Sequence, residues 1–344
     1  MIQLNTVYTQ TNYTVGTSPR GVAVLDLNND GKPDIVVANT VSNNVGVLLN
    51  AGSGTFNAQV VYTNSYYPQS VTLVDVNNDN YPDIIVASNL LNAVNVLTNK
   101  GDGTFNTHVP YPAGTHPSGV AVVDVNNDNY ADIILSVPSG IINVLTNKRN
   151  GTFNTAVPYT AGNTPAGVAV IDVNNDNHPD IVVTNSGSNN VGVLLNTGSG
   201  TFSAQIPYPA GSTPQAVAVA DMNSDNHPDI VVAGNSSGTV SVLLNAGSGT
   251  FNSPITYTVG TSPVAIAIVD VDSDGKPDIA VGNFGSNTVG VLLNAGNGTF
   301  NAQTTYPAIA NPFSIAVVDV NGDNKPDIIF TDSLNNNVGV VLHC

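Results

Sequence analysis

Seven short loops in the sequence place Asp and Asn side chains at alternating positions. In the first loop, DLNNDGKPD, the side chains of Asp26, Asn28, Asp30 and Asp34 offer oxygen atoms at positions 1, 3, 5 and 9. Alternate residues of a tight turn can point to one centre, and the backbone carbonyl at position 7 can add another oxygen. Calcium is bound in proteins by about six to eight oxygens of these kinds. The loop therefore predicts a calcium site.

The same four positions recur in every loop. We expect up to seven structural calcium ions, each tying the strand before its loop to the strand after it. The predicted ligands are Asp26, Asn28, Asp30, Asp34, Asp75, Asn77, Asp79, Asp83, Asp124, Asn126, Asp128, Asp132, Asp172, Asn174, Asp176, Asp180, Asp221, Asn223, Asp225, Asp229, Asp270, Asp272, Asp274, Asp278, Asp319, Asn321, Asp323 and Asp327.

Other interpretations of these loops fit less well. Zinc calls for His or Cys ligands, and the two His in the loops, His178 and His227, stand at position 7, where the side chain should be free. An EF-hand needs a Glu at position 12, where the first loop has Val37, and flanking helices. An array of Asx turns without metal remains open. Three carboxylates in one tight loop repel one another, however, unless a cation lies between them.

The charge of the chain is concentrated in the loops. All 24 acidic residues are Asp, and 22 of them lie in the seven loops, so that seven divalent cations would change the net charge from -17 to -17 + 14 = -3. The seven Lys and Arg are scattered and form no footprint for nucleic acid. The apolar runs are too short for a membrane-spanning helix. The sequence begins without a signal-peptide pattern, and its single cysteine, Cys344, receives no predicted role.

The loops are spaced evenly along the chain. Their first Asp residues lie 49, 49, 48, 49, 49 and 49 residues apart, which means one unit used seven times. No linker interrupts this period, so we expect residues 1–344 to form a single domain. In the first unit four strands fit between turn residues: 21–27, 34–38, 44–49 and 55–62. The fourth strand carries more polar side chains and should be the outer edge.

Seven four-stranded units predict an all-β, seven-bladed β-propeller with antiparallel blades. The seventh unit stops after its third strand, at VGVVLHC. The opening NTVYTQTNYTVGTSP aligns with GTFNSPITYTVGTSP at 249–263, placing Val7 on Phe251 and Tyr13 on Tyr257. The N-terminal strand is therefore expected to close the last blade. An open solenoid would have no use for such a closure.

The unit GVAVLDLNNDGKPDIVVAN...VGVLLNAGSGTF resembles the FG-GAP and VCBS repeats, and the resemblance covers essentially the whole chain. Such repeats occur in integrin α-subunit headpieces, in secreted proteins, and in a fungal seven-bladed lectin that binds N-acetylglucosamine. The resemblance implies that the loops hold calcium between the first and second strands of each blade. The Phe-Gly and Gly-Ala-Pro signatures are blurred here, and Ala131 replaces the proline of the other loops.

The strand order predicts a second face, opposite the metal loops, formed by the connections after strand two and before strand one. The sequences of these connections differ most between the units, and variable loops on a rigid scaffold often bind ligands. Turn formation is the alternative role for their Asn residues. The candidate ligand-binding residues are Asn39, Asn89, Asn185, Asn235, Asn283, Asp332, Tyr66, Tyr67 and His116.

These patterns predict a calcium-stabilised, extracellular binding module that acts as a monomer. Its expected partners are glycans, bound at several similar sites as in a lectin, or an extracellular protein bound by an adhesion scaffold. A structural unit without a ligand is a third possibility. An enzyme is not expected, because Asp102 and Asp332 are the two acids outside the metal loops and near-identical units offer no unique active site.

Overall fold

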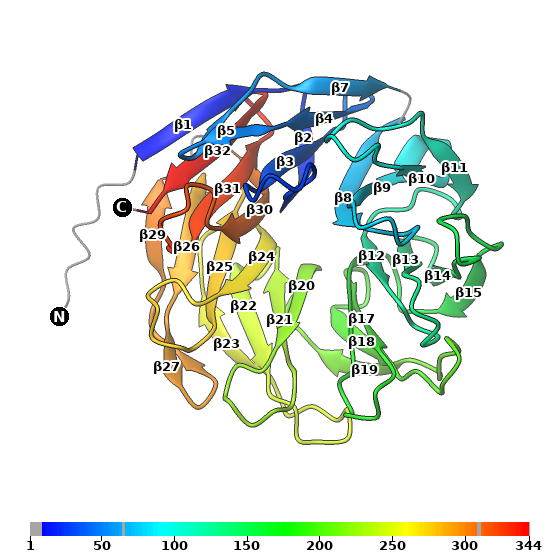
Figure 1. The fold of residues 1–344 in the computed structure, drawn as a ribbon. Coiled ribbons are helices and arrows are strands. Elements are labelled where there is room, and N and C mark those ends of the chain that lie inside the picture. Colours follow the sequence, from blue (N-terminus) through cyan, green and yellow to red (C-terminus); the bar gives the residue numbers. More distant parts are fainter. Residues whose placement is uncertain (1–8, 64–65, 308–310, 344) are drawn as a thin grey trace.

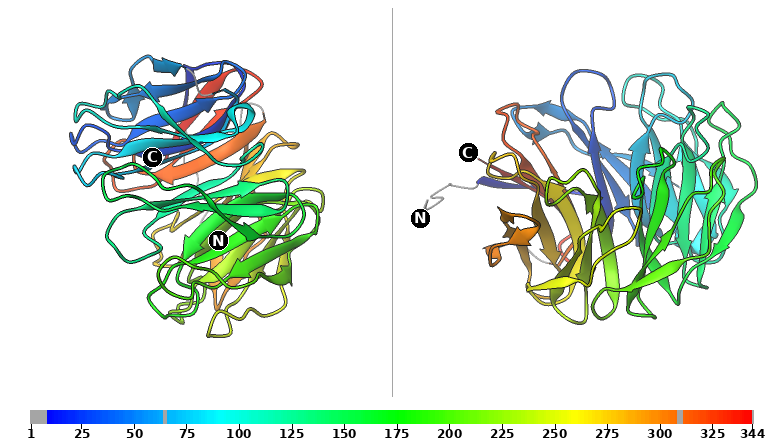
Figure 2. Two further views of the ribbon diagram at one scale, coloured as in Figure 1. Left: turned by 90° about the vertical axis from the view of Figure 1, so that its right-hand side faces the viewer. Right: turned by 90° about the horizontal axis from the view of Figure 1, so that it is seen from below.

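Seven four-stranded antiparallel sheets surround a central axis in the computed structural model, which describes residues 9–63, 66–307 and 311–343 (Figure 1). The predicted seven-bladed propeller is confirmed. Figure 2 shows the ring from its sides, with connecting loops at both ends of the strands. The described residues contain one short 3-10 turn, η1 (Asn89–Leu91), besides strands. None of them forms a helix long and apolar enough to cross a membrane.

Each blade begins at the axis and ends at the perimeter, and blades are numbered by their innermost strands. The innermost strands are β2 (Pro19–Leu25), β8 (Pro68–Val74), β12 (Val120–Val123), β16 (Pro165–Ile171), β20 (Pro214–Ala220), β24 (Pro263–Val269) and β30 (Pro312–Val318). The second strands are β3 (Asp34–Asn39), β9 (Asp83–Ser88), β13 (Asp132–Val137), β17 (Asp180–Asn185), β21 (Asp229–Gly234), β25 (Asp278–Asn283) and β31 (Asp327–Asp332).

The outer half of each blade has two more strands. The third strands are β4 (Asn44–Leu48), β10 (Ala93–Leu97), β14 (Ile141–Leu145), β18 (Asn190–Leu194), β22 (Thr239–Leu243), β26 (Thr288–Leu292) and β32 (Asn337–Leu342). The outer strands are β7 (Val60–Thr63), β11 (Val109–Pro112), β15 (Val157–Thr160), β19 (Ile206–Pro209), β23 (Ile255–Thr258), β29 (Thr304–Pro307) and, in blade 7, β1 (Thr9–Thr14).

The fourth strand of the first unit differs from the predicted 55–62. Residues Thr55–Phe56 form strand β6, which pairs with β5 (Asn50–Gly52) in a small hairpin, and the outer strand starts later, at Val60. The strand is interrupted between Phe56 and Val60. Phe56 is buried at the blade interface, and the N–H group of Asn57 donates to the Leu49 carbonyl. Blade 6 repeats this hairpin with β27 (Asn294–Gly296) and β28 (Thr299–Phe300).

The two ends of the chain meet in blade 7. Strand β1 pairs antiparallel with β32, with Tyr13 opposite Val338, as Figure 1 shows. Val7, which the alignment placed on Phe251, lies outside the described residues, as does Cys344. Packing continues across the junction, since Val37 of blade 1 and Ile329 of blade 7 belong to one buried cluster. The second strands are buried throughout, because neighbouring blades cover both of their faces.

Aromatic pairs and asparagines join neighbouring blades. The ring of Tyr62, from an outer strand, meets Phe105 of the next blade edge-on at 5.5 Å. Asn99 donates from Nδ2 to the Leu27 carbonyl of the previous blade at 2.8 Å and to the Pro82 carbonyl of its own blade at 2.9 Å. Both carbonyls would otherwise be buried without a partner, which is costly. Asparagines in this position, here called bridging asparagines, are Asn50, Asn99, Asn147, Asn196, Asn245 and Asn294.

Candidate metal centres and ligand-binding face

The first Asp of each metal loop organises the turn. In the second loop, one carboxylate oxygen of Asp75 accepts the N–H groups of Asn77 and Asp79, and the other accepts that of Asn80 at 2.6 Å. The loop needs left-handed backbone at positions 4 and 6, where Asn78 has φ 61° and Asn80 has φ 68°. Asn and Gly tolerate this conformation best, which explains why they fill these positions in most loops, although Ser224 and Ser273 stand at position 4 of the fifth and sixth loops.

The last Asp of each loop is a buried clamp between strands. In the second loop, the two carboxylate oxygens of Asp83 accept N–H groups from Val76, at 3.1 Å, and from Asn99, at 2.8 Å. The pKa of Asp83 is raised to about 6, mainly by burial and also by the neighbouring carboxylates of Asp79 and Asp75. The equivalent Asp132, Asp180 and Asp229 also have a pKa raised to about 6.

Positions 1, 3 and 9 converge in the sixth loop. Carboxylate oxygens of Asp270, Asp272 and Asp278 all lie within 4.8 Å of one another. Two oxygens that bind one calcium ion at about 2.4 Å each lie at most about 4.8 Å apart. This cluster can therefore hold a metal ion, and its all-oxygen donors suit a hard cation. In the other loops position 3 is Asn, which offers an amide oxygen instead of a carboxylate.

In three loops the Asp side chain at position 5 pairs with a lysine or arginine. Asp274 accepts a hydrogen bond from Lys276 at 2.5 Å, and this bond lowers the pKa of Asp274. Asp30 pairs with Lys32 and Asp128 with Arg149, both at 3.2 Å. To bind a metal ion in the loop, the carboxylate of each of these three Asp residues would have to leave its lysine or arginine partner. The structure thus brings together positions 1, 3 and 9 more closely than position 5.

An amide oxygen in the third loop supports metal binding independently. Oδ1 of Asn126, at position 3, is shielded from solvent and accepts no hydrogen bond within the described part of the chain. The equivalent oxygen of Asn77 accepts the N–H group of Asp79 at 3.0 Å. Buried polar atoms nearly always have a hydrogen-bond or metal partner, so this oxygen calls for a partner from outside the chain. A cation beside Asp124 and Asp132 would supply that partner.

The raised pKa values predict an unusual pH dependence in the metal-free protein. With EDTA present, we expect the melting temperature to fall by several degrees between about pH 4 and about pH 7. The sign follows from the last Asp of four loops, Asp83, Asp132, Asp180 and Asp229, whose pKa of about 6 when folded exceeds 3.8. The folded state therefore holds these protons more tightly, and that stabilisation is lost as pH rises through about 6. Calorimetry across this range measures the effect.

Calcium should reverse this trend, because it binds ionised carboxylates and competes with protons. The rise in melting temperature caused by calcium is expected to grow over the same pH range. A melting temperature in EDTA that increases steadily from about pH 4 to about pH 7 would contradict the assignment of raised pKa values.

The strand-end candidates for ligand binding need correction. Asn39, Asn185, Asn283 and Asp332 are fully buried. Asn185 accepts the Gly162 N–H at 3.0 Å and donates to Asn190 at 2.8 Å, so it closes the turn between two strands. Asp332 likewise accepts two hydrogen bonds from Asn335. These side chains form turns, and none of them reaches a ligand at the surface.

The remaining candidates lie at or near the surface. Asn89 and Asn235 follow their strands by one residue, since Ser88 and Gly234 occupy the equivalent strand ends. His116 is exposed and its Nδ1 lies 3.1 Å from Oδ1 of Asn89. Tyr66 is 52% exposed. The ring of Tyr67 lies 5.6 Å from the guanidinium carbon of Arg20, near the mouth of the central channel.

Another set of asparagines on this face, which the sequence interpretation missed, latches neighbouring blades. Asn43 accepts the N–H of Tyr67, which precedes the first proline of the next blade, at 2.8 Å. Asn336 does the same for Ser18 across the ring closure, at 2.8 Å. The latching asparagines are Asn43, Asn92, Asn189, Asn287 and Asn336. Their signal in the sequence is an Asn nine residues after the last Asp of each loop in five units.

Two blades carry glycine where this latch would stand, which allows a stabilising substitution. Gly238 has φ +62° and space for a Cβ, whose nearest neighbour would be the Gly260 carbonyl at 3.4 Å. Asn tolerates this conformation. We expect Gly238→Asn to stabilise the protein by about 0.5–1 kcal/mol, by adding a hydrogen bond to the Ser262 N–H and restricting the unfolded chain. Urea unfolding in calcium buffer measures it.

Gly238→Ala is the control without an acceptor, and it should destabilise the protein because Ala is strained at φ +62°. A gain shared equally by the Asn and Ala variants would contradict the latch. A gain confined to the Asn variant supports it.

A surface groove lies between the outer parts of blades 3 and 4. It has a volume of about 470 Å³ and is lined by 158–161 and 202–205. Tyr159 and Phe202 stand edge-on in its wall at 5.2 Å, and Ser203 and Gln205 contribute hydroxyl and amide groups. The mixture of an aromatic surface with neutral donors and acceptors suits a polar, uncharged ligand. Equivalent Tyr–Phe pairs recur at five other blade interfaces within the described residues.

Comparison with known protein families shows a repeated match. A family described as FG-GAP-like repeat matches residues 26–86, 75–135, 133–183, 172–232, 221–281 and 270–330. No curated protein matches the sequence significantly. The matched segments follow the loop period and together span most of the chain.

Solved structures with similar folds have different functions. Virginiamycin B lyase from Staphylococcus aureus aligns with TM-score 0.68 and 16% identity over 98% of this chain and 100% of that one. BBS1N, solved in complex with ARL6DN, aligns with TM-score 0.70 and 13% identity over 99% and 98%. An Agrocybe aegerita lectin that recognises non-reducing terminal N-acetylglucosamine aligns with TM-score 0.61 and 20% identity over 89% and 91%.

The likeness to the lyase overturns the prediction that the chain is not an enzyme. That prediction argued from repeat symmetry and from the shortage of acids outside the loops, yet a lyase is built on this fold. At these identities the likeness shows the fold alone, and fold does not determine function. It therefore assigns no reaction to this chain.

Proposed function

We propose, from the premise that the chain belongs to the family of FG-GAP-like repeats, that it is a calcium-stabilised extracellular module that binds carbohydrate. The groove between blades 3 and 4 carries this proposal, because it combines an aromatic wall with neutral hydrogen-bonding groups on a unit that repeats around the ring. The lectin among the similar structures shows that this fold can present sugar sites.

Calcium in this proposal occupies the metal loops. Positions 1, 3 and 9 supply the carboxylate oxygens that converge in the sixth loop, and in the other loops an Asn amide oxygen would take position 3. In this proposal position 5 joins them when it leaves its lysine or arginine. The ion would neutralise neighbouring carboxylates and hold the innermost strand to the second strand. Loops of this kind suit the millimolar calcium found outside cells, which supports an extracellular location.

Several weak sites would act together. A monosaccharide in one shallow groove buries little surface, so binding to a single site should be weak. Equivalent sites beside the other Tyr–Phe pairs would convert repeated weak contacts into tight attachment to a dense glycan surface. This arrangement requires the grooves to keep fixed positions, which the bridging asparagines and Tyr–Phe pairs provide.

A protein-binding scaffold is the second candidate, and a specific surface feature favours it. Five outer strands expose an aliphatic side chain each, with 41–52% of the residue accessible. These residues are Val60, Val109, Val157, Ile206 and Ile255. A row of exposed aliphatic side chains can contact an apolar partner surface. The similar propeller BBS1N was solved with a protein partner.

A glycan array in calcium buffer tests the carbohydrate proposal. We expect binding to a restricted set of terminal sugars, at least tenfold stronger on dense than on sparse spots because several grooves engage at once. Ala204→Trp, which fills the groove from an exposed position, should weaken attachment modestly because one groove of several is lost. Ala58→Trp, the corresponding change in blade 1, is the matched comparison.

Two results would separate the candidates. Absence of binding to every glycan at high protein concentration and high spot density counts against the carbohydrate proposal. Charge substitution at Val109 and Ile255, which lie outside the segments that line the groove, should abolish contact with a protein partner and leave glycan binding unchanged if the groove is the site.

A further inference from the structure

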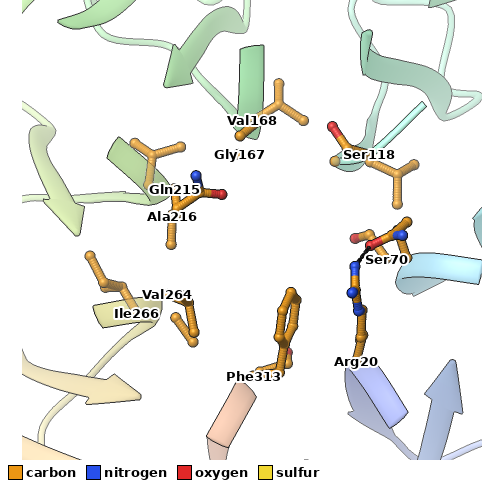
Figure 3. Close-up of a pocket in the computed structure, with 18 of the residues that line it drawn as sticks. Arg20, Ser70, Ser118, Gly167, Val168, Gln215, Ala216, Val264, Ile266 and Phe313 are labelled. Carbon is orange, nitrogen blue, oxygen red and sulfur yellow. Dashed lines mark hydrogen bonds between the residues drawn. The ribbon is translucent and has the colours of Figure 1, made fainter. Parts of the chain in front are cut away.

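The central channel holds a pocket of about 330 Å³ at the end where the innermost strands begin. Its wall includes the residue that follows the first proline of each blade. On one side these residues are Arg20, Gln69 and Ser118, and on the other they are Gln215 and Val264. Figure 3 shows Arg20 and Ser118 on one side, Gln215, Val264 and Ile266 on the other, and Phe313 beside Arg20. The pocket is polar and cationic on one side, and the other side is mostly apolar, with Gln215 as its polar residue.

The repeat symmetry breaks at this position. The seven post-proline residues comprise Arg, Ser, Ala, Val, Phe and two Gln, although the innermost strands that follow them are similar in every unit. The next position is restricted by packing to Gly, Ala or Ser in every unit, and a Cβ on Gly119 or Gly167 would lie 2.4 or 2.6 Å from a carbonyl oxygen of the following blade. The post-proline side chains instead border open space. We therefore attribute the variety of the post-proline residues to the occupant of the pocket and not to the packing of the blades.

Arg20 is the cation of this pocket, and it is held by neutral groups. Its Nη1 donates to Oε1 of Gln69 at 2.6 Å, and its guanidinium carbon lies 4.8 Å from the Phe313 ring centroid. Three other cations pair with Asp side chains, whereas Arg20 forms no ion pair with any residue that the structure describes. Guanidinium has five N–H donors in a planar fork. Most of them remain available to an anion.

We propose that the pocket binds a small organic carboxylate. The flat carboxylate matches the guanidinium fork and can accept two parallel hydrogen bonds from it. Gln69 and the Phe313 ring fix the orientation of Arg20, and the apolar part of the ligand packs against Val264 and Ile266. A monoanion is favoured over a phosphate dianion. Arg20 neutralises one negative charge of the ligand, and the net charge of the chain, -17, repels a second one.

This site is separate from the metal loops. Strand β2 starts at Pro19 beside the pocket and ends at Leu25, next to Asp26 of the first loop. Six residues of strand span about 20 Å. Bound calcium should therefore affect the pocket mainly by keeping the propeller folded, and binding can be measured at saturating calcium. The proposal does not depend on carbohydrate binding in the outer grooves.

Isothermal titration with phenylacetate and its neutral isostere phenylacetamide tests the proposal. Phenylacetate is expected to bind with one site per chain, and phenylacetamide at least tenfold more weakly, because the amide carries no charge. Arg20→Gln should weaken phenylacetate binding at least tenfold and remove the difference between the two probes. Lys100→Gln changes the net charge equally at an exposed position outside the pocket, and it should bind as the wild type does.

A second variant keeps the test independent of the Arg20 substitution. Val264→Phe leaves Arg20 in place and adds a ring to the cavity, so it should abolish phenylacetate binding without lowering the melting temperature by more than a few degrees. Equal binding of the two probes by the wild type overturns the proposal, and so does unchanged phenylacetate binding by Arg20→Gln. Failure of the wild type to bind phenylacetate at any concentration also overturns it.

Discussion

Calcium is expected to raise the melting temperature of the metal-free protein by about 14 °C at a concentration tenfold above the dissociation constant. A ligand that binds the folded state alone stabilises it by about 1.4 kcal/mol per site at that concentration. Seven filled loops would contribute about 10 kcal/mol. A chain of 344 residues has an unfolding entropy of about 0.7 kcal/mol/K, so each kcal/mol raises the melting temperature by about 1.4 °C.

The physical origin of this gain lies in the loops. Buried Asp83, Asp132, Asp180 and Asp229 have a pKa of about 6 and are mostly ionised at neutral pH, beside other carboxylates. A divalent cation relieves this repulsion and connects residues that otherwise push apart. Magnesium keeps several of its waters and demands octahedral geometry at about 2.1 Å, so it should stabilise much less.

Differential scanning calorimetry in EDTA, in calcium and in magnesium makes this measurement, with elemental analysis of the protein as purified. Unchanged curves in all three buffers, together with no bound metal, would falsify the calcium proposal. In that case the loops are Asx turns alone, a role that the hydrogen bonds accepted by Asp75 already illustrate. The clustering of 22 of the 24 Asp residues would then need another explanation.

The sequence predicted the architecture well because the signal is repeated. One unit is ambiguous, but a constant spacing of the leading Asp residues leaves few arrangements, and the Tyr13 alignment correctly placed the N-terminal segment against blade 7. The fourth strand was less predictable. TFNAQVVY contains strand-forming residues throughout, yet Phe56 turns into the blade interface and interrupts the strand. That interruption depends on the neighbouring blade, which a local pattern does not describe.

The ligand-binding candidates were less predictable for a related reason. Asn39 and Asn89 look alike in the sequence, because each follows an apolar run, but one is buried in a turn and the other is half-buried beside His116. Asn43 appears equally polar and serves as an acceptor for the next blade. Contacts between units decide whether the side-chain oxygen of each Asn faces water or accepts a hydrogen bond from a neighbouring N–H group. The Arg20 pocket was missed because seven separate strands assemble it.

Asp180→Ala is the substitution with the largest expected cost. The carboxylate of Asp180 accepts the Val173 N–H at 2.9 Å and the Asn196 N–H at 2.7 Å, both in buried surroundings. Removing it leaves two buried donors without an acceptor, at about 1–3 kcal/mol each. Even in EDTA, we expect a loss of about 2–6 kcal/mol. Calcium should enlarge the loss, because the fourth metal site disappears as well.

Asp176→Ala in the same loop is the matched control, because this carboxylate is exposed and accepts the His178 N–H at 2.9 Å. It should cost little in EDTA and reduce the calcium-dependent gain by about one site. The two variants thus separate the buried clamp, which acts with or without metal, from the ligand, which acts only through metal. Equal losses for both variants in EDTA would show that the buried Asp180 carboxylate stabilises the metal-free protein no more than the exposed Asp176 does, and would remove the clamp from the account of how each blade is held together.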